Sequence, residues 1–423
     1  MILHYDFLAN CLKKVIIDKA KFYTMTNEEI FQLKDFSFKE KNNCISVVAS
    51  SVRHYLFFRL TLSRKFNLKE DNPAYFDLIY CLTDLFFTKR YEKDEVLKTI
   101  DDIFEKNKLE INSDEFKTFF VDKTPYVILE DVLNNEINEL YFSARYNIPT
   151  WLIRMWNKQY SKKECLKICK AINARHNIYC KKNNLFDVSK LDIDNNPDFV
   201  FDDKLNLYRY NGKASFKKIP YIKDHLIYET NYLNDLLLKK VPWHMQDTIV
   251  FYSQEKTSMF FEILATYNKE NLLGFFSSDF TKLSKNLEYV RKNKTDKIFY
   301  EQCEISGVEA RLPKKANIFY LLPESSNFSY YYISPEHIIN FDNNKINEFI
   351  KKQKEMIQEA SKNVEVDGYL VYFTYTLDKK ENEKNIEEFL KNNVEFTLVE
   401  ENTIFPTIKD NNFGYYAILK RIK

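Results

Sequence analysis

The first 140 residues carry apolar side chains at three- and four-residue spacing. The spacing is clearest in two series: Val47, Val48, Val52, Leu56 and Leu60, and then Phe76, Ile79, Leu82 and Leu85. This is the period at which side chains return to one face of an α-helix. The stretch contains no glycine, and its only prolines are Pro73 and Pro125. The pattern therefore predicts an all-α domain over residues 1–140.

From about residue 226 to the end, apolar or aromatic runs alternate with charged helical stretches. The predicted strands are Thr248–Ser253, Leu272–Ser277, Asn317–Leu322, Tyr369–Thr374, Phe396–Val399 and Tyr415–Leu419. Helical periodicity is clearest in Lys345–Val364. Alternation of this kind is typical of a mostly parallel sheet with helices on both faces. We therefore expect an α/β domain over residues 226–423.

Residues 141–225 are predicted to form a small basic α/β connector, with Thr150 capping the helix that begins it. The basic residues of Trp151–Asn183 are Arg154, Lys158, Lys162, Lys163, Lys167, Lys170, Arg175, Lys181 and Lys182, against the single acid Glu164. A solvated helix face would explain such a run. Contact with RNA phosphates would also explain it, because a Lys or Arg beside a phosphate releases counterions. The predicted phosphate contacts are Arg154, Lys158, Lys162, Lys181 and Lys182.

The overall charge and the cysteines narrow the class of protein. A net charge of +2, from 63 Lys and Arg against 61 Asp and Glu, argues against a histone-like or acidic-tail protein. The seven cysteines are odd in number and lack paired zinc-type spacing, which predicts reduced thiols and no metal. No apolar run approaches the ~18–20 residues of a membrane span. We expect a cytoplasmic monomer that binds neither membrane nor DNA.

One segment near the end resembles a known family. Gly368–Leu377 is GYLVYFTYTL, and Glu381-Asn382-Glu383 and then Phe389-Leu390 follow it. This resembles the RNA cytosine-C5 methyltransferases of the Fmu/Sun (RsmB) type, in which the stretch is roughly GG-x-LVYSTCS-x-x-x-EEN-E followed by FL. Gly414-Tyr415-Tyr416-Ala417 is similar to that family's closing GFF-x-A.

Further matches extend the resemblance toward the start of the chain. Pro149-Thr150-Trp151-Leu152 is similar to the family's P-x-WL, and Asn173 to Asn183 keeps the spacing of its N-x-x-P…RVN element. Val47–Arg59 and Ala74–Phe87 resemble two helices of the NusB-like RNA-binding domain. The resemblance implies a NusB-like domain over 1–140, the connector over 141–225 and a Rossmann-like methyltransferase fold over 226–423.

The matching positions lack the family's chemistry. Family members attack C6 of a flipped-out cytosine with a cysteine thiolate, because C5 accepts a methyl group only while C6 is saturated. At the nucleophile's position this chain has Tyr375, after Thr374, and at the second cysteine's position it has Glu324, after Pro323. Leu321 replaces the aspartate that faces the base. The resemblance therefore implies no catalytic residue here.

The cofactor loop is altered as well. The family's A-A-P-G-G-K-T aligns with Phe251–Thr257, so that Gln254 and Glu255 replace glycines and only Lys256 and Thr257 remain. Asp279 matches the acid that pairs with ribose hydroxyls, although an aspartate that caps a helix is commoner. We expect no bound cofactor. If S-adenosylmethionine does bind, the resemblance implies Lys256, Thr257 and Asp279 as its contacts.

The sequence thus predicts a pseudoenzyme of ribosome biogenesis that binds rRNA or a small ribosomal subunit precursor. An active rRNA cytosine-C5 methyltransferase is the alternative, and a protein-interaction scaffold is a third possibility. His244 and His337 are isolated in the sequence, and Cys303 precedes what we expect to be the third strand of the sheet. None of the three is predicted to be catalytic.

Overall fold

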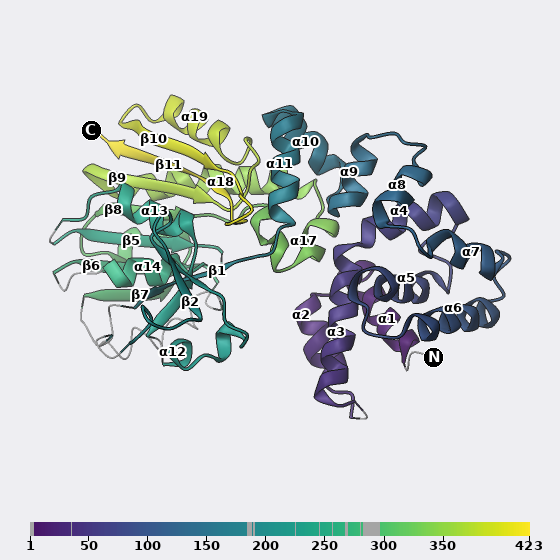
Figure 1. The fold of residues 1–423 in the computed structure, drawn as a ribbon. Helices are drawn as coiled ribbons and strands as arrows, with labels where there is room; N and C mark the ends of the chain where they lie inside the picture. The colour runs from purple at the N-terminus through teal and green to yellow at the C-terminus, as the bar shows by residue number, and fades with distance from the viewer. Residues whose placement is uncertain are drawn as a thin grey trace. The chain divides into compact units, whose positions relative to one another are not determined.

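The computed structural model of the 423-residue chain describes residues 4–34, 36–183, 188, 191–224, 226–244, 246–255, 257–266, 270–279, 281 and 297–423. It divides into two compact units (Figure 1). The helical unit is Met1–Cys169 with Tyr330–Phe341, and the sheet unit is Lys170–Ser329 with Asp342–Lys423. Neither division falls at residue 140 or 225, and the three predicted domains stay a prediction.

The helical unit is built from short helices, which confirms an all-α start to the chain. Its α-helices are α1 (Tyr5–Ile16), α2 (Phe22–Met25), α3 (Phe38–Arg53), α4 (Tyr55–Phe66), α5 (Tyr75–Thr83), α6 (Lys93–Asn107), α7 (Ser113–Phe120), α8 (Pro125–Val132), α9 (Glu139–Tyr146), α10 (Thr150–Tyr160) and α17 (Pro335–Ile339). Helix α11 (Lys162–Ile172) begins in this unit, and η1 (Thr26–Ile30) and η2 (Asp84–Thr88) are π-helical turns.

Asparagines stand at both the beginnings and the ends of helices in this unit. Asn67 and Asn147 follow α4 and α9 in the left-handed conformation, with φ of 52° and 54°. Asn112 and Asn138 accept hydrogen bonds from the first-turn amides of α7 and α9. Asparagine suits both roles because its short side chain bonds local backbone groups and tolerates positive φ.

The apolar series from Val47 to Leu60 is interrupted at His54, where α3 ends and α4 begins. The buried side chain of Asn147 bridges this break. It donates to the Val52 carbonyl at 2.9 Å and accepts from the Leu56 amide at 3.0 Å. Periodicity alone could not reveal the break, because the residue that satisfies the open backbone groups lies far away in sequence. Thr150 is the first residue of α10 rather than its cap, and no side chain caps that helix.

Residues Tyr330–Phe341 come from the middle of the sheet sequence yet pack within the helical unit. The Tyr331 hydroxyl donates to the Tyr146 carbonyl at 3.0 Å, and the Asn340 amide donates to the Val15 carbonyl at 2.8 Å. The connection that follows strand β8 is therefore held by the helical unit.

The sheet unit contains a seven-stranded sheet of order β10-β11-β9-β8-β5-β6-β7. Its strands are β5 (Thr248–Ser253), β6 (Leu272–Ser277), β7 (Ile298–Gln302), β8 (Ala316–Leu322), β9 (Val364–Thr374), β10 (Phe396–Ile404) and β11 (Gly414–Arg421). β5 to β9 pair in parallel, and β11 lies antiparallel to both β9 and β10. The order reverses between β5 and β8, which is the switch point at which ligands bind in sheets of this kind.

All six predicted strands are present, and β7 was missed. This five-residue edge strand ends on the exposed Glu301 and Gln302, so its apolar run is only three residues long. Cys303 consequently follows the third strand of the sheet instead of preceding it, which corrects the placement expected from the sequence.

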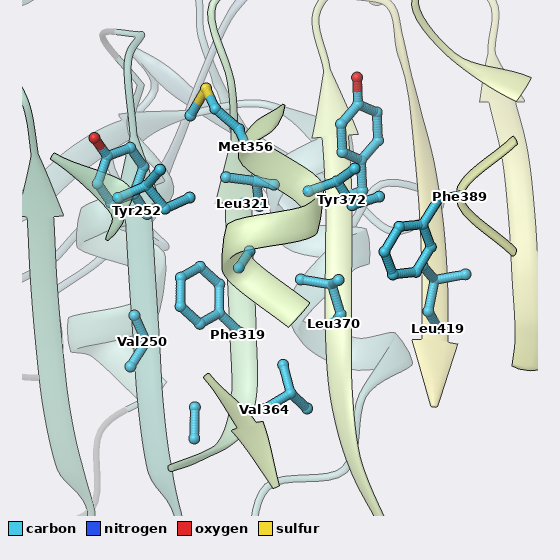
Figure 2. Packing of buried hydrophobic residues seen from close by; sticks show 14 of the residues in the cluster. Val250, Tyr252, Phe319, Leu321, Met356, Val364, Leu370, Tyr372, Phe389 and Leu419 are labelled. Atoms are coloured by element: carbon cyan, nitrogen blue, oxygen red, sulfur yellow. The ribbon is translucent and has the colours of Figure 1, made fainter. Parts of the chain in front are cut away.

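Helices cover both faces of this sheet. The helices α18 (Lys345–Lys362) and α19 (Glu383–Asn392) pack on one face, where Met356, Ile357 and Phe389 meet apolar side chains of the strands (Figure 2). The helices α13 (Tyr232–Lys240) and α14 (Met259–Thr266) cover the other face through Leu237 and Phe260. The arrangement confirms a Rossmann-like methyltransferase fold.

A smaller antiparallel sheet of order β2-β3-β1-β4 precedes the large one within the sheet unit. Its strands are β1 (Ile178–Lys182), β2 (Phe199–Asp202), β3 (Leu207–Tyr210) and β4 (Ile227–Thr230), accompanied by α12 (Pro220–Lys223). Over the described residues, no helix combines the length and the apolar content that a membrane span requires.

Candidate functional site

The carboxyl ends of β5, β6, β7 and β8 surround a cavity of about 690 Å³. Its lining includes Gln254 and Ser278, which follow β5 and β6, Glu304 and Glu324, which follow β7 and β8, and Lys352, Glu355 and Glu359 on α18. Four carboxylates therefore face this space with one ammonium group. The cavity lies where the fold places ligands, but its charge is negative.

Glu255 ties together the two loops that border the switch point. Its carboxylate accepts from the Ser325 amide at 3.1 Å and from the Asn327 side-chain amide at 3.0 Å. Beside it, the Gln254 side chain donates to the Ser278 hydroxyl at 3.2 Å. Glycines at these two positions would leave the same space open to a ligand. The residues present therefore do not fit the glycine-lined cradle that the resemblance implies for the cofactor.

Tyr375, at the position of the family's nucleophile, is a buried hydrogen-bonded phenol. Its side chain is 5% exposed. The hydroxyl donates to the Asn234 side-chain carbonyl at 2.7 Å and lies 2.5 Å from the Thr257 hydroxyl. Burial raises the pKa of Tyr375 well above its ordinary value. The group is therefore neutral near pH 7 and positioned as a structural donor.

Glu324, at the second cysteine's position, lies at the surface of the cavity. Its side chain is 41% exposed, and its carboxylate is 3.5 Å from the Lys352 ammonium. The Gln353 side-chain amide donates a hydrogen bond to the Glu324 backbone carbonyl at 2.9 Å. Leu321, the third altered position, is fully buried in strand β8. No thiol stands at any of these three positions.

A buried carboxyl that the sequence analysis did not single out lies beneath the same loop. Glu381 accepts from the Ser326 hydroxyl at 2.5 Å, from the Ser326 amide at 2.9 Å and from the Gln353 side chain at 3.0 Å. Burial raises the pKa of Glu381 to about 7, although the hydrogen bonds from Ser326 oppose this rise. The Glu381-Asn382-Glu383 motif was visible in the sequence, but its burial was not.

The predicted cofactor contacts have local partners. The Thr257 hydroxyl accepts from the Met259 amide at 3.1 Å, at the start of α14. Asp279 accepts from both the amide and the hydroxyl of Thr281, at 2.9 and 2.7 Å. These two bonds close a local turn of the kind aspartate favours. The chain that follows lies outside the described residues, so the capping role and the ribose contact both stay predictions. Lys256 lies outside the described residues.

The predicted phosphate contacts fall into two groups. Arg154, Lys158 and Lys162 are exposed on α10 and α11, and no carboxylate of the described chain lies within ion-pair distance of them. Lys181 instead contacts the Asp235 carboxylate and lies 2.8 Å from that of Glu262. Lys182 is 2.7 Å from the Asp194 carboxylate. The role of all five in RNA binding stays a prediction. Contact with a phosphate requires an exposed charge, which the first group has.

The remaining candidates show no catalytic arrangement. Cys303 is buried, its amide donates to the Ser277 carbonyl at 3.0 Å, and burial raises the pKa of its thiol. His337 lies in the helical unit with its ring 5.7 Å from that of Phe341, and the His244 amide donates to Asp247 at 2.6 Å. In the part of the chain that the structure describes, no three His, Cys, Asp or Glu side chains gather as metal ligands would.

Comparisons with known proteins agree with this architecture. The sequence profile of the family described as 16S rRNA methyltransferase RsmB/F matches residues 334–420. The crystal structure of PH0851 superimposes with a TM-score of 0.73 at 15% identity and covers 100% of both chains. No curated protein sequence matches the chain.

Two proteins of Pyrococcus horikoshii share the fold over a smaller part of the chain. A methyltransferase homologue has a TM-score of 0.53 at 13% identity, covering 68% of this chain and 100% of its own. NSun6, solved with SFG, has a TM-score of 0.52 at 14% identity, covering 65% of this chain and 98% of its own. The chain thus matches the RsmB/F family over residues 334–420, as the resemblance predicted, and shares the fold of solved methyltransferases.

Proposed function

We propose that the protein is a catalytically degenerate relative of the 16S rRNA (cytosine-C5) methyltransferases that binds rRNA or a small-subunit assembly intermediate. The observation that carries this proposal is the state of Tyr375, a buried phenol whose hydroxyl bonds to Asn234 and Thr257. A neutral phenol in such contacts cannot take the part of a thiolate.

The chemistry supports this view at the second position as well. The family's route breaks the covalent adduct with the help of its second cysteine, and here the equivalent side chain is the carboxylate of Glu324 beside Lys352. Covalent attack on C6 needs a nucleophile that is largely deprotonated at working pH. With a phenol at 375 and a carboxylate at 324, the family's route has neither of its sulfur groups.

We further propose that S-adenosylmethionine does not bind usefully. The Glu255 carboxylate bridges to Ser325 and Asn327 across the place where the family's glycines leave room. A cofactor there would have to break both hydrogen bonds and set its own carboxylate beside that of Glu255. The cost of leaving a carboxylate without its partners in a partly buried site opposes this exchange.

RNA is the partner that the remaining features favour. Arg154, Lys158 and Lys162 offer exposed positive charge, and α10 carries no acidic residue. In this proposal the helical unit is an RNA-binding domain of the NusB-like type, and the protein acts as a cytoplasmic monomer in ribosome biogenesis. Phosphate contacts by lysine and arginine would supply most of the affinity.

An active methyltransferase is the second candidate, and Asp279 favours it. This residue follows β6, at the place where the resemblance puts the acid that holds a ribose. The solved relative NSun6 also carries SFG, which suggests that a ligand binds this fold. A scaffold for other proteins, the third candidate, would explain the fold but not why Arg154, Lys158 and Lys162 have no carboxylate partner among the described residues.

The test is to incubate the protein with S-adenosylmethionine and 16S rRNA, both protein-free and within small subunits. Mass spectrometry of the digested RNA should find no 5-methylcytosine, while a filter-binding assay at about 0.1 M salt finds the RNA bound. Methylated product would overturn the proposal. If that product disappears in Cys303→Ser, the nucleophile has moved to Cys303. A protein that neither methylates nor binds RNA would favour the scaffold.

A further inference from the structure

A cavity of about 360 Å³ opens within the helical unit, where α4, α9, α10 and α17 meet. Its walls are apolar, from Leu56, Leu60, Leu140, Ala144, Pro149 and Ile339. The polar groups that line it are Arg59, Ser63, Ser143 and Thr150, and Trp151 supplies its one aromatic ring. No carboxylate is among its lining residues, in contrast to the cavity at the ends of the strands.

The size and chemistry of this cavity suit a planar heterocycle. A cavity of roughly 150 Å³ with apolar walls already takes benzene, and this one is more than twice that size. Unpaired RNA bases are recognised by stacking on aromatic rings or guanidinium planes, together with hydrogen bonds to their edges. Trp151 and Arg59 offer the planar groups, and the three hydroxyls offer donors and acceptors for a base edge.

The Trp151 ring is packed against a second ring, and the exposed Arg59 head group has one ion-pair partner. Phe341 stacks on the Trp151 ring, with 6.0 Å between the ring centroids and 28° between the planes. The Arg59 guanidinium lies 3.5 Å from the Glu70 carboxylate, with its side chain 60% exposed. A ring that is already packed, as that of Trp151 is, loses little conformational entropy when it binds a ligand.

The position of the cavity connects it with the basic face of α10. Trp151 lies in the first turn of this helix, and Arg154 and Lys158 follow it by three and seven residues. Side chains at such spacing lie along one face of a helix. A strand of RNA whose phosphates follow Arg154 and Lys158 would thus reach the cavity with its next nucleotide.

We propose that this cavity binds the base of one unpaired nucleotide, while Arg154 and Lys158 hold the phosphates beside it. The inference rests on the proposed function, because it assumes that RNA binds the helical unit. It adds a base-recognition site to a surface that would otherwise bind phosphates alone.

The test compares chains that share a ribose-phosphate backbone and differ in whether they carry bases. Fluorescence anisotropy measures the affinity for single-stranded oligoadenylate and oligouridylate of about 12 nucleotides, and for an abasic ribose-phosphate chain of equal length. The wild-type protein should bind at least one base-bearing chain about ten-fold more tightly than the abasic chain. Ala144→Leu, which fills the cavity with an apolar side chain, should bind the base-bearing and abasic chains equally.

Ala144→Ser, nearly isosteric with alanine, is the matched control and should keep the ten-fold preference. If Ala144→Leu does not fold, the pair Trp151→Leu and Trp151→Phe replaces it, and only the phenylalanine variant should keep the preference. Equal binding of base-bearing and abasic chains by the wild type would overturn the inference, and so would an unchanged preference in Ala144→Leu. Either result would leave the proposed function standing. Absence of any RNA binding would overturn both.

Discussion

The loops at the carboxyl ends of β5, β8 and β9 differ from the exposed face of α10 in whether their polar side chains have partners within the protein. In the loops, Glu255, Tyr375 and Glu381 all bond to neighbouring protein groups. On α10, Arg154 and Lys158 are exposed, and no ion pair within the described chain engages them. Buried polar groups are costly without partners, and in these loops the protein's own side chains satisfy them.

The predicted phosphate contacts also differ in whether they are paired within the protein. Lys181 and Arg154 belong to one basic run of the sequence, yet Lys181 lies between Asp235 and Glu262 while Arg154 faces solvent. A basic residue is available to RNA only where it is not already paired with a carboxylate of the protein. The comparison therefore separates groups that stabilise the fold from groups that are open to a ligand.

The largest expected effect on stability is that of Lys181→Ala. Removing this ammonium leaves Glu262, which is 1% exposed, without an ion-pair partner, and leaves Asp235, which is 3% exposed, with Lys239 alone. Breaking a buried ion pair in this way costs about 3–5 kcal/mol of unfolding free energy, and urea titration measures it. Lys182→Ala removes the more exposed pair with Asp194 and should cost less than about 1 kcal/mol. Equal, small losses would show that Lys181 is as available to RNA as Lys182.

The second effect is a pH dependence that comes from Glu381. Its pKa of about 7 in the folded protein, against an ordinary 4.5, means that the folded state binds this proton more tightly. Its contribution to stability is therefore fully present below about pH 4.5 and is lost as the pH rises through 7, by up to ~3 kcal/mol. Urea titrations at several pH values should show this slope flattened in Glu381→Gln.

The control for this slope is Glu388→Gln, which removes an exposed carboxylate paired with Lys354 and should leave the pH profile unchanged. A wild-type profile that is flat between pH 4.5 and 7, or a slope that Glu381→Gln keeps, would contradict the assignment of the titration to this buried group.

A smaller loss is expected for Tyr375→Phe. The change removes the hydroxyl that bonds to Asn234 and Thr257, and Asn234 is fully buried. Leaving the buried side-chain carbonyl of Asn234 without its donor costs about 1–3 kcal/mol, which lowers the temperature of unfolding. Tyr23→Phe, at a side chain that is 76% exposed, should leave that temperature unchanged. An unaltered unfolding temperature in Tyr375→Phe would mean that the phenol is not a structural donor.

The smallest effect on stability, and the largest on RNA, belongs to Arg154→Ala with Lys158→Ala. Both side chains are exposed, so the free energy of unfolding should change by no more than about 0.5 kcal/mol. Losing two phosphate contacts should reduce the log–log salt slope of RNA binding by about 1.4–1.8. Lys345→Ala with Lys351→Ala, two exposed lysines of α18, serves as control. An unchanged slope in the first double variant would remove α10 from the RNA surface.

The sequence predicted the positions of the strands better than the contacts within the candidate site. Thr248–Ser253 and Leu272–Ser277 are β5 and β6 residue for residue, because a fully buried parallel strand is an unbroken apolar run. Edge strand β7 has an apolar run of only three residues and was missed. The altered positions 324 and 375 could be found by resemblance, because they interrupt a recognisable motif.

The contacts of the site could not be found in this way. Glu255 meets Ser325 and Asn327, and Lys181 meets Asp235 and Glu262, across 54 to 81 residues of sequence. Only the fold brings such pairs together, and local periodicity carries no trace of them. For the same reason the sequence could not predict the cavity beside Trp151, since Arg59 and Ile339, which also line it, are far away in the sequence.

Calorimetric titration of the purified protein with S-adenosylmethionine tests the central claim most directly, namely that the protein's own side chains now satisfy the former ligand site. The account predicts no binding heat at micromolar cofactor. It also predicts that Gln254→Gly with Glu255→Gly, which frees Ser325 and Asn327, is the variant in which binding can return. A micromolar dissociation constant for the wild-type protein, worth about −8 kcal/mol, would contradict the account.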